Sequence, residues 1–154
     1  MASGPPPTSA VPVARTGSCL CRAVKYEVTG EPVTIRVCHC GNCKKATGAA
    51  FMTNGFFKES QVRILAGEDM LKFYADPGTA SGTPLNRYFC GNCGSNVFLR
   101  SQIKVLNGKK NDLHIVALGT LDEVAEWKPN TEIFKEQKTH FVTGIEVQTR
   151  NPKL

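Results

Sequence analysis

The chain has 154 residues, of which 41% are hydrophobic and 21% are charged, and its formal net charge is +6. This composition fits one globular domain and excludes a collagen-like chain, a coiled coil and a disordered polymer. No run of about 18 apolar residues occurs, which excludes a transmembrane helix. The mild positive charge would suit an anionic partner, but lysines scattered over a solvated surface explain it equally well.

The two ends of the chain differ in composition from the middle. Residues 1–15 are expected to form a disordered tail, because prolines 5–7 fit neither a helix interior nor a sheet. This segment has no apolar stretch of the kind that a secretory signal needs, so we expect a cytoplasmic protein. The last three residues, P-K-L, differ from the peroxisomal address S-K-L in their first residue, which leaves peroxisomal targeting as an alternative.

Short alternating or β-branched segments between glycine and proline turns predict a chain made mainly of strands. The expected strands cover residues 23–28, 34–37, 51–57 with a break at Gly55, 62–65, 71–74, 85–89, 96–99, 114–118, 131–134 and 144–147. One short helical turn is expected between residues 37 and 45. Asn107-Gly108 predicts a hairpin turn. The predicted fold class is therefore mainly β.

The seven cysteines are the most informative feature, and they fall into three groups. Cys19 and Cys21 form the first group, Cys38, Cys40 and Cys43 the second, and Cys90 and Cys93 the third. A cytosolic chain is kept reduced, so metal binding or catalysis explains these cysteines better than disulfides do. A cluster of soft thiolates favours zinc over magnesium or calcium.

Seven ligands divide naturally into four and three. Four thiolates close a structural zinc site, whereas three leave a position open for water or substrate. The second group lies within six residues and is able to bind one ion as a local unit, and the first and third groups would then share another ion about 70 residues apart. His39 lies between two of these cysteines, and its side chain is expected to point away. In the alternative reading, His39 closes a structural site.

The motifs that surround these cysteines resemble those of a known family. They are G-S-C-L-C at residues 17–21, C-H-C-G-N-C-K-K-A-T-G at 38–48, F-C-G-N-C-G at 89–94, G-T-L-D at 119–122, W-K-P at 127–129 and I-F at 133–134. Together they resemble the glutathione-dependent formaldehyde-activating (GFA) family, to which centromere protein V also belongs. The resemblance implies a β-tent fold of short antiparallel sheets held together by zinc.

The resemblance also assigns the two zinc ions and the boundaries of the domain. It implies a structural zinc on the first and third cysteine groups and a catalytic zinc on the second, so that Cys38, Cys40 and Cys43 are the catalytic residues. Residues 16–136 would form the zinc-binding domain. Residues 137–154 would form an extension that packs on this domain or trails from it.

The activity that the resemblance implies is that of a carbon–sulfur lyase similar to S-(hydroxymethyl)glutathione synthase. Such an enzyme joins a small thiol such as glutathione to formaldehyde or another aldehyde. Three thiolates make a bound zinc formally anionic, which favours thiolate binding or exchange over strong Lewis-acid action. Arg36, Lys44 and Lys45 lie beside the second group and would attract the carboxylates of glutathione. Alternatively, the two lysines belong to an ordinary solvated surface.

Several neighbouring residues are weaker candidates for the same pocket. Thr47 and Gly48 would shape it through their backbone N–H groups. Phe51, Phe56 and Phe57 would either line it or pack in the core.

A second class of function is a non-catalytic, zinc-stabilised module that binds protein or nucleic acid. Such a module needs a strongly basic, aromatic-rich face or a long basic arm. Arg15 is the one charged residue of the N-terminal segment, and the densest basic stretch covers residues 104–110. We therefore expect neither nucleic acid nor a membrane as a partner.

Overall fold

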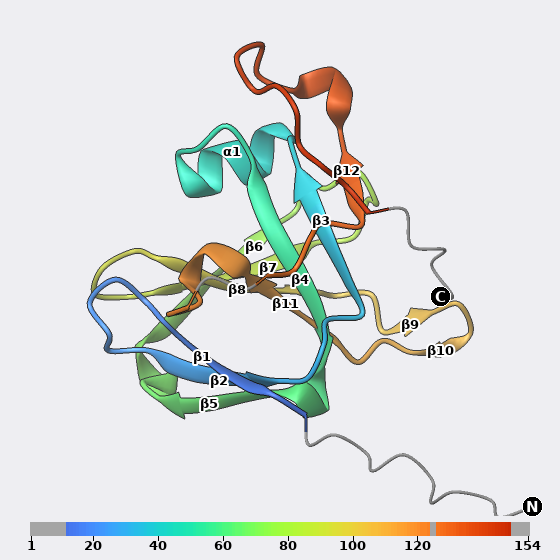
Figure 1. The fold of residues 1–154 in the computed structure, drawn as a ribbon. Helices are drawn as coiled ribbons and strands as arrows, with labels where there is room; N and C mark the ends of the chain where they lie inside the picture. The colour runs from blue at the N-terminus through green and yellow to red at the C-terminus, as the bar shows by residue number, and fades with distance from the viewer. Residues whose placement is uncertain (1–11, 124–125, 149–154) are drawn as a thin grey trace, which may run out of the picture.

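The computed structural model describes residues 12–123 and 126–148. Its strands form a three-stranded sheet, a seven-stranded sheet and a two-stranded hairpin, with one helix, α1, and short 3-10 helices between them (Figure 1). The mainly β prediction is confirmed. Most of the predicted N-terminal tail and the P-K-L end lie outside the described residues. No helix in the described part of the chain is long and apolar enough to cross a membrane.

The three-stranded sheet is antiparallel and has the order β1-β2-β5. It consists of β1 (Ala14–Ser18), β2 (Lys25–Thr29) and β5 (Val62–Ala66). The first strand begins inside the segment expected as a tail, since Ala14 pairs with Thr29 and Arg15 with Val28. The segment A-R-T-G-S lacks an apolar alternation, so its strand comes from pairing with β2 and not from its own pattern.

The seven-stranded sheet has the order β12-β3-β4-β11-β8-β7-β6. Its strands are β3 (Thr34–Cys38), β4 (Met52–Lys58), β6 (Leu71–Asp76), β7 (Leu85–Cys90), β8 (Asn96–Ser101), β11 (Leu113–Ala117) and β12 (Thr131–Ile133). All neighbours are antiparallel except β12, which runs parallel to β3. The sheet is therefore mixed, not purely antiparallel as the resemblance implied.

The predicted hairpin and helical turn are both present. β9 (Val105–Leu106) pairs with β10 (Lys109–Lys110), and the turn residues Asn107 and Gly108 have φ angles of 51° and 73°. Positive φ at both positions is what a tight two-residue hairpin turn requires. Helix α1 covers Gly41–Thr47 and so extends beyond the single turn expected. The 3-10 helices cover Glu59–Gln61, Glu68–Met70, Leu118–Thr120 and Lys135–Gln137.

Two of the strand predictions were wrong. Gly55 does not interrupt a strand, because β4 runs through it and pairs it with Ile35 on one side and Val116 on the other. A Cβ at this position would lie 2.6 Å from Leu118 Cδ2, so the glycine gives room to a packed leucine. The weak pattern at residues 144–147 forms no strand.

The main core lies between the two larger sheets. Tyr26 and Val28 of β2 meet Phe57, Phe98 and Val116 of the seven-stranded sheet, and each of these side chains is at most 2% exposed. The rings of Tyr26 and Phe98 pack edge to face with centroids 4.9 Å apart. Helix α1 and the C-terminal segment lie on the other side of the seven-stranded sheet (Figure 1). The second face of this sheet is therefore not part of the main core.

His114 makes the stability of this core depend on pH. Its ring packs against Phe98 at 4.8 Å, its Nε2 atom makes no hydrogen bond within the described structure, and burial together with the charge of Arg100 lowers its pKa to about 4. In the unfolded chain this histidine has a pKa of 6.5. Between pH 6.5 and 4 the unfolded chain therefore binds a proton at this position, whereas the folded chain does not. This contribution to stability is complete above pH 6.5 and is lost as the pH falls toward 4.

We therefore expect His114→Gln to weaken the acid sensitivity of the fold. Between pH 7.5 and 5, the wild type should lose about 2 kcal/mol more unfolding free energy than this variant, as measured by urea denaturation. His140→Gln, at an exposed position, is the control and should behave like the wild type. Parallel pH profiles for wild type and His114→Gln would contradict a partly buried, neutral His114.

Candidate functional site

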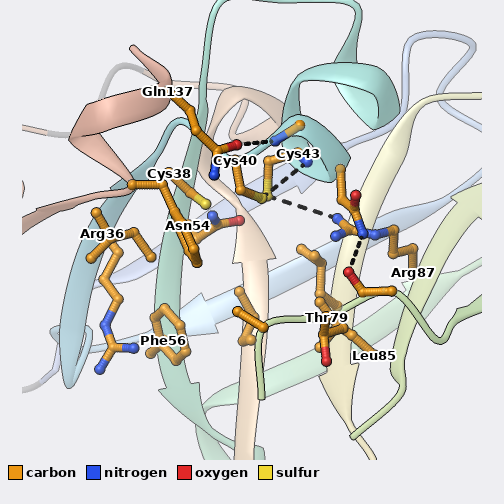
Figure 2. Close-up of a pocket in the computed structure, with 18 residues that line it drawn as sticks. Arg36, Cys38, Cys40, Cys43, Asn54, Phe56, Thr79, Leu85, Arg87 and Gln137 are labelled. Atoms are coloured by element: carbon orange, nitrogen blue, oxygen red, sulfur yellow. Dashed lines mark hydrogen bonds between the residues drawn. The ribbon is translucent and has the colours of Figure 1, made fainter. Parts of the chain in front are cut away.

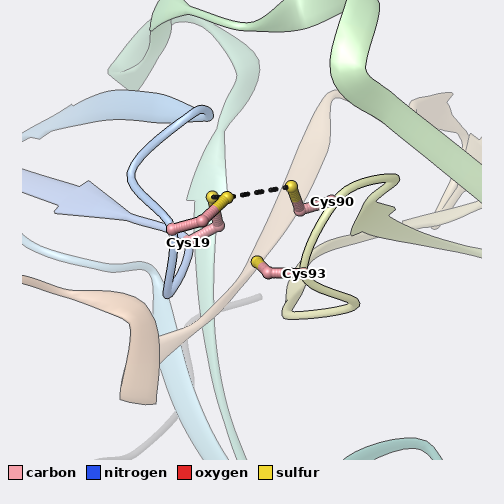
Figure 3. A group of neighbouring side chains, drawn as sticks. Cys19, Cys90 and Cys93 are labelled. Carbon is pink, nitrogen blue, oxygen red and sulfur yellow. Dashed lines mark hydrogen bonds between the residues drawn. The ribbon is translucent and has the colours of Figure 1, made fainter.

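Four cysteines converge where the two larger sheets meet, and we call them the cysteine tetrad: Cys19, Cys21, Cys90 and Cys93. The first two lie on the turn between β1 and β2, whereas Cys90 ends β7 and Cys93 lies on the following turn (Figure 3). All four sulfur atoms lie within 4.8 Å of one another, with separations of 3.6 Å for Cys19–Cys21 and 3.8 Å for Cys21–Cys90. Sulfurs arranged tetrahedrally about 2.3 Å from zinc are about 3.8 Å apart, so the tetrad has the dimensions of a closed zinc site.

The surroundings of the tetrad favour the thiolate form of one cysteine and disfavour that of another. Burial raises the pKa of Cys19 to about 11, even though the backbone N–H of Val24 donates to its sulfur at 3.3 Å. Hydrogen bonds from Ser95 lower the pKa of Cys93 to about 5. Four negative charges this close together repel one another strongly, so full ionisation of the tetrad needs a cation among the sulfurs.

The other three cysteines, Cys38, Cys40 and Cys43, form a second group, which we call the cysteine triad. Cys38 ends β3, Cys40 is the N-cap of α1 and Cys43 lies in the first turn of that helix. The backbone N–H of Cys43 donates to the Cys40 sulfur at 3.4 Å, and all three sulfurs lie within 4.8 Å of one another. Three thiolates leave one position of a tetrahedral zinc open, which is the pattern of catalytic sites.

The triad shares its protons unequally. The hydrogen bond from Cys38, helped by the positive charge of Arg87, lowers the pKa of Cys43 to about 6 although burial opposes the change. The same hydrogen bond to Cys43, together with burial, raises the pKa of Cys38. The triad therefore holds one readily formed thiolate next to a neutral thiol, and it is ready to lose further protons to a metal ion.

A cavity of about 380 Å³ opens beside the triad and is lined by all three of its cysteines (Figure 2). It lies on the face of the seven-stranded sheet that is turned away from the main core. Successive side chains of a strand point to opposite faces, so β4 sends Asn54 and Phe56 to the cavity and Phe57 to the core. One sheet thus forms the hydrophobic core with one face and the candidate site with the other.

A buried ion pair holds the triad end of the cavity in place. Arg87 of β7 donates to Asp76 of β6 at 2.8 Å, both side chains are 8% exposed, and Arg87 Nη1 lies 3.9 Å from the Cys43 sulfur. The amide of Asn42 on α1 donates to both carboxylate oxygens of Asp76, at 3.0 and 2.9 Å. Burial alone would raise the pKa of Asp76, but the hydrogen bonds from Arg87 and Asn42 outweigh it and hold the pKa below its usual range. The pair therefore anchors α1 to the sheet.

His39 lies outside the triad, as its position between Cys38 and Cys40 led us to expect. Its side chain is fully buried, and Nε2 lies 2.8 Å from a carboxylate oxygen of Glu132 on β12. Lys138 also reaches that carboxylate, at 2.9 Å. His39 thus joins β3 to the parallel strand β12.

The other aromatic and basic candidates divide between several places. Arg36 and Phe56 both line the cavity, with the guanidinium 4.7 Å from the centre of the ring. Phe57 belongs to the core, and Phe51 packs against the His39 ring at 5.7 Å. Of the three phenylalanines proposed from sequence, the structure therefore brings one into this cavity.

The remaining candidates belong to helix α1 and do not line the cavity. Lys44 donates to the backbone carbonyl of Gln137 at 2.8 Å, and Lys45 is exposed. Thr47 donates to the Cys43 carbonyl at 2.8 Å, and Gly48, with φ of 64°, ends the helix. These residues position the triad through the helix that carries it.

Sequence reasoning missed Asn54, Asp76 and Arg87. A signal existed for two of them: Asn54 is a polar residue at the centre of an apolar strand, and Arg87 lies three residues before a cysteine pair. The contacts of Arg87 depend on the pairing of β6 with β7, which places Tyr74 opposite Arg87 and Asp76 opposite Leu85. No local pattern reveals that register.

Comparison with known proteins identifies the family of the chain. The family model of the glutathione-dependent formaldehyde-activating enzyme (GFA) matches residues 14–137, so the chain belongs to this family. An uncharacterized lyase of Schizosaccharomyces pombe is 28% identical over 82 residues, which are 53% of this chain and 54% of the yeast protein. The match thus spans about half the length of that relative.

A solved structure gives a likeness of fold. The crystal structure of a Rhodobacter sphaeroides protein, a structural genomics target, matches with a TM-score of 0.52 and 23% identity. The match covers 72% of this chain and 91% of the bacterial one. The mainly β arrangement therefore recurs in a protein of low sequence identity.

The buried pair of Asp76 and Arg87 yields a stability prediction. Asp76→Ala should lower the free energy of unfolding by about 3 kcal/mol or more, because it leaves a buried guanidinium without its partner. Glu27→Ala, which breaks the exposed pair with Arg63 (3.2 Å), is the control and should cost about 1 kcal/mol or less. Equal losses for the two variants in chemical denaturation would contradict the anchoring role of Asp76.

Proposed function

We propose that this chain is a zinc-dependent enzyme of the carbon–sulfur lyase type that forms and breaks adducts between a small thiol, such as glutathione, and an aldehyde. The observation that carries the proposal is the placement of three cysteine sulfurs at the wall of a cavity, apart from a second set of four. Membership of the GFA family and the lyase name of the yeast relative support the same class of reaction.

The donor chemistry of both groups fits zinc. Cys19, Cys21, Cys90 and Cys93 would hold a structural ion, and Cys38, Cys40 and Cys43 would hold a catalytic ion. When bound at the triad, zinc would supply a positive centre with one open coordination position facing the cavity. The sulfur separations support this division, as does the finding that no fourth ligand joins the triad from residues 12–123 or 126–148.

The protein's own groups would orient the reactants around that position. Arg36 presents a positive charge to the cavity and would attract a carboxylate of the thiol. Arg87 lies beside Cys43 and would offset part of the negative charge of three thiolates. The apolar walls would exclude water from the reacting sulfur and carbonyl carbon.

The proposal predicts different effects for the two cysteine groups. Wild-type protein, purified with zinc under reducing conditions, should contain two zinc ions per chain by elemental analysis. Cys40→Ser should retain one zinc, keep most of its thermal stability and lose adduct exchange by at least about a hundredfold. Cys93→Ser should lose the other zinc and melt at a lower temperature, because the two sheets lose their crosslink.

Exchange between free aldehyde and adduct is measurable by NMR exchange spectroscopy with glutathione and an aldehyde panel that includes formaldehyde. Unchanged exchange in Cys40→Ser, after loss of its zinc, would contradict a catalytic triad. Equal retention of both ions under mild chelation, together with nucleic-acid binding that weakens steeply with salt, would instead favour the non-catalytic module.

A further inference from the structure

The cavity beside the triad is much larger than formaldehyde requires. Its volume of about 380 Å³ lies within the range of about 300–1,000 Å³ that is usual for pockets of drug-sized ligands. Formaldehyde has only two non-hydrogen atoms and is close to water in size. Bound near the triad, it would contact only the side chains beside the sulfurs, and the rest of the cavity would be left to the thiol and to a larger aldehyde substituent.

The walls of this cavity select for apolar groups. Six large apolar side chains from five segments line it: Phe56, Leu85, Leu99, Ile115, Ile133 and Phe134. Of its two guanidinium groups, Arg87 is paired with Asp76, whereas Arg36 lies over the ring of Phe56 and keeps its charge for a carboxylate of the thiol. Against this apolar part of the wall, a peptide-like group would lose hydrogen bonds to water, whereas an apolar substituent gains contacts.

The side-chain amide of Asn54 is a polar group of the cavity wall whose oxygen has no hydrogen-bond partner among the described residues. The residue is 6% exposed, it lines the cavity, and its Oδ1 atom is buried without a hydrogen-bond partner among the described residues. Figure 2 shows it between the triad and Phe56. An unpaired buried amide is costly for the free protein. A ligand hydroxyl satisfies either end of an amide, because it both donates and accepts.

From these observations we propose that the cavity binds the aldehyde-derived part of a hemithioacetal whose substituent is apolar and about the size of a phenyl group. This inference rests on the proposed thiol–aldehyde chemistry and names its substrate class. In the reaction, the thiol sulfur forms a bond to the carbonyl carbon, the carbonyl π bond breaks, and the thiol proton passes to the oxygen. The resulting hydroxyl binds Asn54, and the substituent fills the apolar part of the cavity.

The first test compares aldehydes with zinc-loaded, full-length protein and glutathione. The kcat/KM for adduct exchange should be at least about tenfold higher with phenylacetaldehyde than with formaldehyde. Leu85→Trp, which fills part of the cavity from β7, should lower the phenylacetaldehyde value at least about tenfold more than it lowers the formaldehyde value. Leu65→Trp, on the exposed side of β5, is the matched control and should change neither value.

A preference for formaldehyde, or an equal loss of kcat/KM for both aldehydes in Leu85→Trp, would overturn the inference.

Binding of stable thioethers separates this failure from a failure of the lyase proposal. S-benzylglutathione should raise the melting temperature of the protein more than S-methylglutathione does. This difference without exchange of any aldehyde would refute the lyase chemistry while supporting the cavity as a pocket for apolar substituents. An equal effect of the two thioethers, including no effect, would count against the pocket itself.

Asn54 provides an independent second variant. Asn54→Leu, nearly the same in shape, should leave the melting temperature unchanged or higher, because it removes an unpaired buried polar group. It should lower kcat/KM for the phenylacetaldehyde adduct about tenfold and leave binding of S-benzylglutathione, which has no hydroxyl on its substituent, unchanged. A purely structural asparagine would instead lower the melting temperature, and weaker binding of the thioether would show that Asn54 does not recognise the hydroxyl.

Discussion

The rest of the structure depends on one contact between the two larger sheets. It joins Cys19 and Cys21, on the turn between β1 and β2, to Cys90 and Cys93 at the end of β7. Cys21 and Cys90 are 69 residues apart in the chain, yet their sulfurs lie 3.8 Å from each other. Closing so long a loop costs conformational entropy. An ion that binds only to the folded state would offset this cost, because its binding free energy adds to the stability of the fold. Cys19 and Cys90 are also almost fully buried in the main core, so the crosslink and the apolar packing reinforce each other.

With the two sheets fixed, the seven-stranded sheet serves two purposes. Its side chains alternate between the main core, which holds Phe57 and Phe98, and the cavity, which Phe56 and Leu99 line. The cavity is then completed by α1 and by the C-terminal segment, where Phe134 adopts a φ of 57°. Left-handed backbone is unfavourable for a bulky residue and is concentrated at ligand sites. The strained backbone of Phe134 therefore lies at the wall of the cavity, where a ligand would contact it.

The repeated tetrapeptide C-G-N-C shows how far sequence reasoning reaches. The grouping of the cysteines predicted two convergent sets, and the structure brings together the same two sets. The local conformations differ: the first copy opens α1 with Cys40 as its N-cap, and the second turns between β7 and β8. The spacing of the cysteines along the chain indicates which sulfurs are able to bind one ion. The backbone conformation at each group depends on the neighbouring strands.

What the sequence did not reveal depends on contacts between distant segments. The strand β12 has only three residues and runs parallel to β3, an arrangement that a short β-branched pattern does not specify. Likewise, Asn54 becomes a site residue only because β4 pairs with β3 and β11, which turns the amide toward the cavity. Alternation predicts that residues 54 and 56 share a face, but not which face meets the core.

X-ray absorption spectroscopy at the zinc edge tests the division of the seven sulfurs most directly. Seven cysteine ligands shared by two zinc ions should give a mixed sulfur and light-atom environment with zinc–sulfur distances of about 2.3 Å. Adding a small thiol should convert the remaining light-atom position to sulfur and leave the zinc content unchanged. A single zinc per chain, or a coordination environment that a thiol does not alter, would contradict one closed and one open site.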